Sequence, residues 1–155
     1  MNLSKNFTLK ELTKSDFAIR NNIPNEPNMD QIVKLKELCN KILQPVRNHF
    51  GPVTVTSGFR SPELCVKIGS SLNSQHAEGM AADFEVAGVD NADLAYWIKD
   101  NLEDWDQMIL EFYTLGEPNS GWVHCSYSDK PRKQFLRAFK EDGKTKYKPI
   151  IGDIR

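Results

Sequence analysis

The stretch from Ser74 to Asp83 constrains the fold of this chain more than any other part of its sequence. It reads Ser-Gln-His-Ala-Glu-Gly-Met-Ala-Ala-Asp, so an imidazole and a carboxylate stand seven residues apart around a glycine, among small side chains. Imidazole nitrogen and carboxylate oxygen are both common ligands of zinc, and a catalytic zinc has three protein ligands and one position for water. Because His76 and Asp83 supply only two, the fold must bring a third ligand from elsewhere.

His124 is the candidate for that third ligand. The chain has three histidines, and His124 stands in the strand-like run from Gly121 to Tyr127. His49 instead falls at the end of a predicted helix, where the helix dipole favours a cation. On spacing alone, a histidine on an apolar element is more often a hydrogen-bonded core residue than a ligand, so both interpretations stay open here. Our hypothesis is one zinc ion held by His76, Asp83 and His124.

Three motifs in this chain resemble, in order and spacing, those of a known family. The 74–83 stretch is similar to the Ser-x-His-x-x-Gly-x-Ala-x-Asp signature of the M15 zinc peptidases, which include D-Ala-D-Ala carboxypeptidases and related peptidoglycan-cleaving enzymes. Ser57-Gly58-Phe59-Arg60-Ser61-Pro62 resembles a second family segment, and Trp122-x-His124 resembles the strand with the third ligand. Further likeness at residues 7–12 and 43–47 extends it over nearly the whole chain.

The resemblance implies a fold, a cofactor and a substrate. The implied fold is a single α+β domain over residues 1–155 with the hedgehog/DD-peptidase-like architecture. The implied cofactor is one Zn²⁺ ion, and the implied reaction is hydrolysis of peptidoglycan stem peptides, either as a D-Ala-D-Ala carboxypeptidase or as an L-Ala-D-Glu endopeptidase.

One position departs from the family pattern. Many M15 relatives carry an acidic residue three positions before the last histidine, as the base that activates water, and this chain has Gly121 there. Two hypotheses follow. Either the base comes from another strand, or the zinc site is catalytically silent and the chain is an M15-fold module that binds the cell wall or forms part of a phage particle.

A predicted hairpin supplies a candidate for the missing base. Residues 107–113 and 121–127 are strand-like, and the loop between them contains glycine, proline and asparagine. A period of two puts six residues on a core face: Met108, Leu110, Phe112, Val123, Cys125 and Tyr127. The other face collects Ile109, Glu111, Trp122, His124 and Ser126. Glu111 is therefore the predicted base, the alternative being a hydrogen-bonding partner of a ligand histidine. Glu78 and Glu117 are weaker candidates because both are expected to face solvent.

The resemblance also implies residues that contact the substrate. Arg60 has a catalytic and substrate-binding role by this criterion, since a guanidinium suits a carboxylate or a developing oxyanion. An arginine at a strand end is otherwise usually a solvated or structural ion-pair residue. Ser74 is placed to hydrogen-bond the substrate, and Trp122 either forms a pocket wall or packs in the core.

Hydrophobic periodicity predicts N-terminal helices followed by a small, mainly antiparallel sheet. Helices are expected over residues 8–19, 29–46, 62–68 and 91–101, and strands over 53–56, 81–86 and 133–140. Pro45 is expected to bend or tighten the last turns of the second helix. Residues 69–74 are predicted to form a polar loop that delivers His76.

Composition excludes several classes of protein. With 155 residues, a net charge of -1 and a pI near 6.3, the chain has no strong field to attract nucleic acid. The N-terminus lacks the apolar run of an export signal, and no transmembrane span is present. We therefore expect a monomer made in the cytoplasm, without membrane insertion, that reaches the bacterial wall after release and is encoded by a phage or prophage. The cysteines at positions 39, 65 and 125 are expected to be reduced thiols.

Overall fold

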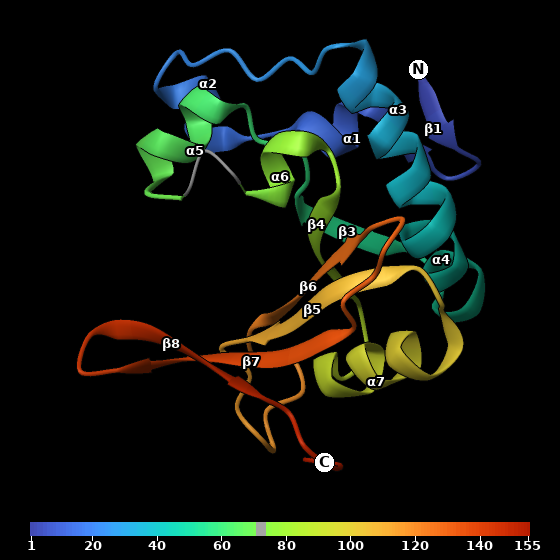
Figure 1. Cartoon of the computed structure of the whole chain (residues 1–155), viewed down its shortest axis with the longest axis vertical. Helices are drawn as coiled ribbons and strands as arrows, with labels where there is room; N and C mark the ends of the chain where they lie inside the picture. The colour runs from blue at the N-terminus through green and yellow to red at the C-terminus, as the bar shows by residue number, and fades with distance from the viewer. Residues whose placement is uncertain (71–73) are drawn as a thin grey trace.

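The computed structural model describes residues 1–70 and 74–155 and is built on a six-stranded sheet (Figure 1). The strand order is β3-β4-β6-β5-β7-β8. The strands are β3 (Val53–Ser57), β4 (Ala81–Val86), β5 (Trp105–Glu111), β6 (Trp122–Tyr127), β7 (Gln134–Glu141) and β8 (Lys144–Pro149). Neighbours pair antiparallel except β5 and β7, which are parallel. The predicted α+β class with a mainly antiparallel sheet is confirmed.

The N-terminal segment forms a small ribbon and two short helices, where one helix was predicted. The elements are β1 (Asn2–Ser4), β2 (Phe7–Thr8), α1 (Leu9–Thr13) and α2 (Asp16–Arg20). The capping box of Thr8 and Glu11 begins α1. The prediction of a single helix was wrong, because Lys14 is extended and the Ser15 hydroxyl accepts a hydrogen bond from the backbone N–H of Ala18. A serine in that position begins a new helix.

The long amphipathic helix contains a widened turn. It comprises α3 (Met29–Leu38), a π-helical turn (Cys39–Leu43) and α4 (Gln44–Phe50). Pro45 was expected to bend or tighten these turns, but the turn before it is wider than an α-helical turn, since the N–H of Gln44 bonds to the carbonyl of Cys39, five residues back. Pro45 has no N–H to continue the α-helical ladder, which favours such a local rearrangement.

The remaining helices are α5 (Pro62–Ile68), α6 (Gln75–Glu78) and α7 (Asn91–Asn101), and α5 and α7 have the predicted bounds. The predicted loop 69–74 includes residues 71–73, which lie outside the described residues. Apolar residues of α7 and of the long helix pack with one face of the sheet in a single core cluster, which includes Leu38, Ile42, Phe84, Leu94, Ile98, Met108 and Val123. None of the described helices combines the length and the apolar character needed to cross a bilayer.

The predicted hairpin is present, but one of its residues, Phe112, does not lie on the predicted face. Strands β5 and β6 pair with Ile109 opposite His124 and Glu111 opposite Trp122, as the alternation required. Phe112, predicted for the core face, instead directly follows β5 and has a φ of +55°. Its ring lies against Trp122, with ring centroids 5.4 Å apart, so Phe112 belongs to the Trp122 side.

Strand β8 is the free edge of the sheet and is mostly exposed. Three lysines alternate along it, Lys144, Lys146 and Lys148. Charged side chains on an edge strand discourage pairing with another chain, so these lysines protect the hairpin from aggregation.

Candidate metal centre

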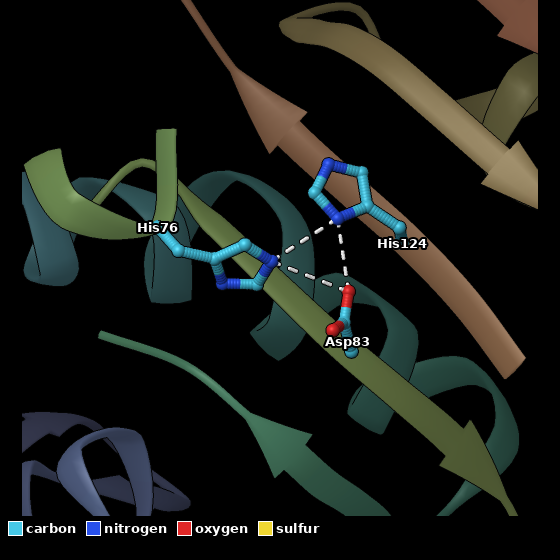
Figure 2. Close-up of side chains that lie close together, drawn as sticks. All are labelled: His76, Asp83 and His124. Carbon is cyan, nitrogen blue, oxygen red and sulfur yellow. Dashed lines mark hydrogen bonds and ion pairs between the residues drawn. The ribbon is translucent and has the colours of Figure 1, made fainter. Parts of the chain in front are cut away.

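Side chains from three elements, His76, Asp83 and His124, meet on the face of the sheet opposite the core cluster (Figure 2). The Nδ1 atom of His124 lies 2.9 Å from Oδ1 of Asp83. The Nε2 atom of His76 lies 3.2 Å from Nδ1 of His124 and 3.4 Å from Oδ1 of Asp83. All three residues are buried, with relative exposures of 3%, 8% and 9% for His76, Asp83 and His124.

The sheet register and a short helix bring these groups together. Asp83 on β4 and His124 on β6 are directly opposed across an antiparallel pair, so their side chains leave the same face. His76 comes from α6, which lies over that face (Figure 2). Helix α6 ends at Gly79, whose φ is +78° and whose Cα faces the carbonyl of Gln31, where an added Cβ would lie 2.7 Å away. A glycine at this position therefore fixes where the helix stops and how it approaches α3.

The carbonyl of Gly58 orients His76, an interaction that sequence reasoning missed. Nδ1 of His76 lies 2.7 Å from this carbonyl oxygen. Because a carbonyl can only accept, Nδ1 carries the proton, and the lone pair of the neutral ring is on Nε2, which faces Asp83 and His124. Such a partner on the second ring nitrogen is the usual support of a ligand histidine. The signal in the sequence was Gly58 itself, within the family-like segment that precedes Arg60.

Burial and charge keep Asp83 and His76 in the state that binds metal. Burial would raise the pKa of the Asp83 carboxyl, but His76 and His124 outweigh it and hold this pKa well below its usual range. Burial lowers the pKa of His76, more than the Asp83 carboxylate raises it. The site therefore offers a carboxylate and a neutral imidazole at neutral pH, as metal binding requires.

The geometry fits a tetrahedral ion. Ligand atoms about 2.0–2.1 Å from a zinc ion in a tetrahedral arrangement lie about 3.3 Å from one another. The three distances here are 2.9, 3.2 and 3.4 Å.

Cys125 follows His124 but lies on the core face, where burial raises the pKa of its thiol and keeps it protonated. All three cysteines are buried free thiols, as predicted. The residues present therefore suit one ion with two nitrogen ligands and one oxygen ligand.

The metal-free protein is expected to lose stability in mild acid. The folded-state pKa of His76 lies below its ordinary value of 6.5, so the unfolded chain binds the proton more readily. The Asp83 contribution is lost in the same direction, as the pH falls below about 4. We expect the free energy of unfolding to fall by up to about 1.4 kcal/mol per pH unit below pH 6.5. Thermal melting in chelator over this range measures it, and a melting temperature that rises towards acid would contradict this account.

Glu111 lies on the same face of the sheet as Asp83 and His124. It is partly buried, opposite Trp122 on β6 and two residues from Ile109, which faces His124. Burial raises the pKa of Glu111, and the Asp83 carboxylate raises it further, while His124, the Trp122 indole and Arg60 counteract them. A carboxyl with this balance can change protonation state during a reaction. Glu78 and Glu117 are both exposed, as expected.

The three predicted substrate residues border the same site. The guanidinium of Arg60 lies 3.4 Å from Oδ2 of Asp83. Ser74 is the N-cap of α6, and its hydroxyl accepts a hydrogen bond of 3.2 Å from the backbone N–H of His76. Trp122 packs against Phe112. Within the described part of the chain, Arg60 Nε and Trp122 Nε1 are buried donors without a well-formed hydrogen bond. His49, by contrast, stacks on Trp97 at the end of α4.

Comparison with known families shows to which family the chain belongs. A model of the peptidase M15 family matches residues 5–126, which include all three ligand candidates and Glu111. The chain belongs to the peptidase M15 family. A search of the curated proteins found no match. M15 membership, together with the buried His-Asp-His group, supports a metallopeptidase. The matched region ends within β6, so β7 and β8 lie beyond it.

Gly121, the position where many M15 relatives are acidic, has no room for a side chain. Its φ is +64°, and a Cβ there would overlap the carbonyl oxygen of Glu111. The close approach of Gly121 to the end of β5 accompanies the positive φ of Phe112. An acidic base at position 121 is thus incompatible with this backbone, so a base has to come from another position, and Glu111 is a partly buried carboxylate on the face that carries Asp83 and His124.

We expect Gly121→Asp to destabilise the fold by at least about 2 kcal/mol, because a left-handed backbone and a steric overlap both oppose it. Gly143→Asp is the matched control, since Gly143 has a φ of +76° but nothing within 4 Å of an added Cβ. Urea denaturation of both variants measures the difference. Equal stabilities would show that the backbone at position 121 relaxes freely.

Proposed function

We propose that this M15 protein is a zinc-dependent peptidase that hydrolyses peptidoglycan stem peptides, at a D-Ala-D-Ala or an L-Ala-D-Glu bond. The observation that carries the proposal is the convergence of His76, Asp83 and His124 at 2.9–3.4 Å in a chain that matches the M15 family over residues 5–126. These three residues would hold the ion. A bound zinc supplies Lewis acidity and lowers the pKa of water towards about 7.

In this proposal Glu111 is the general base. Its carboxylate takes a proton from the attacking water and then gives it to the nitrogen of the leaving amine. The raised pKa of Glu111, caused mainly by burial, makes its carboxylate a stronger base than an exposed glutamate. Catalysis is most efficient when the pKa of such a group approaches the working pH.

Arg60 and Trp122 bind and orient the peptide in this proposal. Arg60 Nε is a buried donor without a well-formed partner in the described chain, and buried donors of this kind are normally satisfied by a ligand or water. Carbonyl and carboxylate oxygens of a stem peptide are suitable acceptors for it. Trp122 contributes the wall of its ring, since its indole N–H lies near enough to Glu111 to lower the pKa of that carboxyl. The hydroxyl of Ser74 accepts from the His76 backbone, and in this proposal it donates its own proton to the substrate. We propose that the protein acts in this way on the bacterial wall as a monomer.

The test is digestion of defined muropeptides with the zinc-loaded protein, followed by mass spectrometry. We expect one set of products, loss of cleavage on chelation, and recovery when zinc is added. The masses of the products identify the scissile bond and separate carboxypeptidase from endopeptidase action. Cleavage that survives complete removal of metal would contradict the proposal.

A second candidate function is a catalytically silent M15-fold module that binds the cell wall or belongs to a phage particle. The glycine at position 121 favours it, because the family's usual acidic residue cannot stand there. The same experiment separates the two candidates. Stoichiometric zinc and measurable muropeptide binding without any product would favour the silent module.

A further inference from the structure

The face that holds the metal group continues across the strands beyond the family match. Trp122 pairs with Glu111, Glu111 with Ala138, and Ala138 with Tyr147, so these four residues form one row across β6, β5, β7 and β8. Directly opposed residues in a sheet project from the same face. Tyr147 therefore projects from the face that carries Glu111 and His124, two strands, or about 10 Å, from Glu111.

The residue between Glu111 and Tyr147 is small and covered. Ala138 is only 2% exposed, although β7 has only the edge strand β8 beyond it. Its methyl group points to the same face as Glu111 and Tyr147, so the larger side chains around it must cover it. An alanine leaves space above the sheet in which two flanking side chains can lean towards each other. Tyr147 itself keeps 54% of its surface exposed and is free to contact a ligand.

The carboxylates of the site also affect the pKa of the Tyr147 phenol. Burial raises its pKa, and the carboxylates of Glu111 and Asp83 raise it further. Both acids belong to the metal face, and neither is on β7 or β8. The basic side chains of β8, at positions 144, 146 and 148, alternate with Tyr147 and project from the opposite face. A phenol with a raised pKa stays protonated at neutral pH and serves as a hydrogen-bond donor.

We propose that Tyr147 is a substrate-contacting residue of this site, whose hydroxyl donates a hydrogen bond to a carbonyl or carboxylate oxygen of the bound stem peptide. In this proposal the β7–β8 hairpin forms the wall of the site beside Glu111. Arg60 lies beside Asp83, at the other end of the site. Figure 1 shows the hairpin extending away from α5 and α6. This inference rests on the proposed function and extends the site beyond residues 5–126.

The first test compares Tyr147→Phe with the wild type on a cleaved muropeptide. The variant loses only the hydroxyl, and we expect KM to rise about 3- to 10-fold with kcat within about twofold, as for one lost neutral hydrogen bond. Tyr113→Phe is the matched control, because its hydroxyl bonds to Asp90 at 3.0 Å, outside the row. Its KM should match that of the wild type. An unchanged KM in Tyr147→Phe would overturn the inference.

The second test needs no substrate. In protein with ¹³C-labelled tyrosine rings, Glu111→Gln should lower the pKa of Tyr147 towards its ordinary value of 10.0 and leave that of Tyr113 unchanged. A Tyr147 pKa that does not respond would place the phenol away from Glu111 and overturn the inference. If the wild type neither cleaves nor binds any stem peptide, the proposed function and this inference fail together. Cleavage with an unchanged KM in Tyr147→Phe defeats the inference alone.

Discussion

Glu111→Gln is expected to bind zinc with wild-type stoichiometry and to lose about 100- to 10,000-fold in kcat, the range that general acid–base catalysis supplies. Glutamine keeps the shape of the side chain but cannot accept a proton at neutral pH. The proposed ligands His76, Asp83 and His124 are separate residues, so we expect the metal group to stay intact. Muropeptide turnover and metal content, measured on the same preparation, test both parts of this expectation.

Two exposed glutamates serve as controls for that variant. Glu78, next to the ligand segment, and Glu117, in the β5–β6 loop, both face solvent. Their glutamine variants should retain full activity. If Glu111→Gln were also fully active, Glu111 would be a partner of the ligand groups and not the base. A variant that lost zinc together with activity would assign Glu111 a structural role in the metal site.

Asp83→Asn is expected to weaken zinc binding by at least about 100-fold and to abolish cleavage at stoichiometric zinc. Substitution of groups that merely support a ligand already costs about 10- to 100-fold in metal affinity, and Asp83 is itself a proposed ligand. Asparagine has nearly the same size but no charge to offset the ion or to face the guanidinium 3.4 Å away. Competition with a chromophoric chelator measures the zinc affinity.

The matched control is Asp100→Asn, since Asp100 is exposed on α7 and takes no part in the metal group. Its zinc affinity should equal that of the wild type. Excess zinc should restore part of the activity of Asp83→Asn if the defect is in binding. Wild-type zinc affinity in Asp83→Asn would remove this residue from the ligand set.

The meeting of His76, Asp83 and His124 could be predicted because most of the signals for it are local. His76 and Asp83 lie in one short segment, and the alternation of β5 and β6 put His124 and Glu111 on one face, as the pairing shows. Alternation predicted the wrong face for Phe112, because its left-handed backbone depends on the close approach of Gly121 to Glu111. That approach is a contact between backbones, so side-chain periodicity could not reveal it.

Two helix boundaries escaped prediction for local reasons. Ser15 begins a second helix where the apolar pattern alone continued the first, because its hydroxyl satisfies the backbone N–H of Ala18. The π-helical turn before Pro45 preserves the apolar stripe, so the pattern of buried residues gave no sign of it. Both features depend on backbone hydrogen bonds, which periodicity does not report.

Other parts of the site depend on tertiary contacts. The carbonyl of Gly58 supports His76 across a separation of 18 residues. Tyr147 reaches the metal face only because β7 pairs parallel with β5, which puts Ala138 opposite Glu111. A hairpin following β6 could have paired in several ways. Alternation in the sequence predicts β7 as a strand, but it predicts neither β8 nor the strand that β7 joins.

Zinc K-edge X-ray absorption on the zinc-loaded wild-type protein, with metal content measured on the same sample, shows directly whether His76, Asp83 and His124 hold the ion. We expect one zinc per chain with two imidazole nitrogens, one carboxylate oxygen, further nitrogen or oxygen scatterers near 2.0–2.1 Å, and no sulfur. A chain that takes up no zinc, or a zinc with thiolate sulfur at about 2.3 Å, would contradict this expectation.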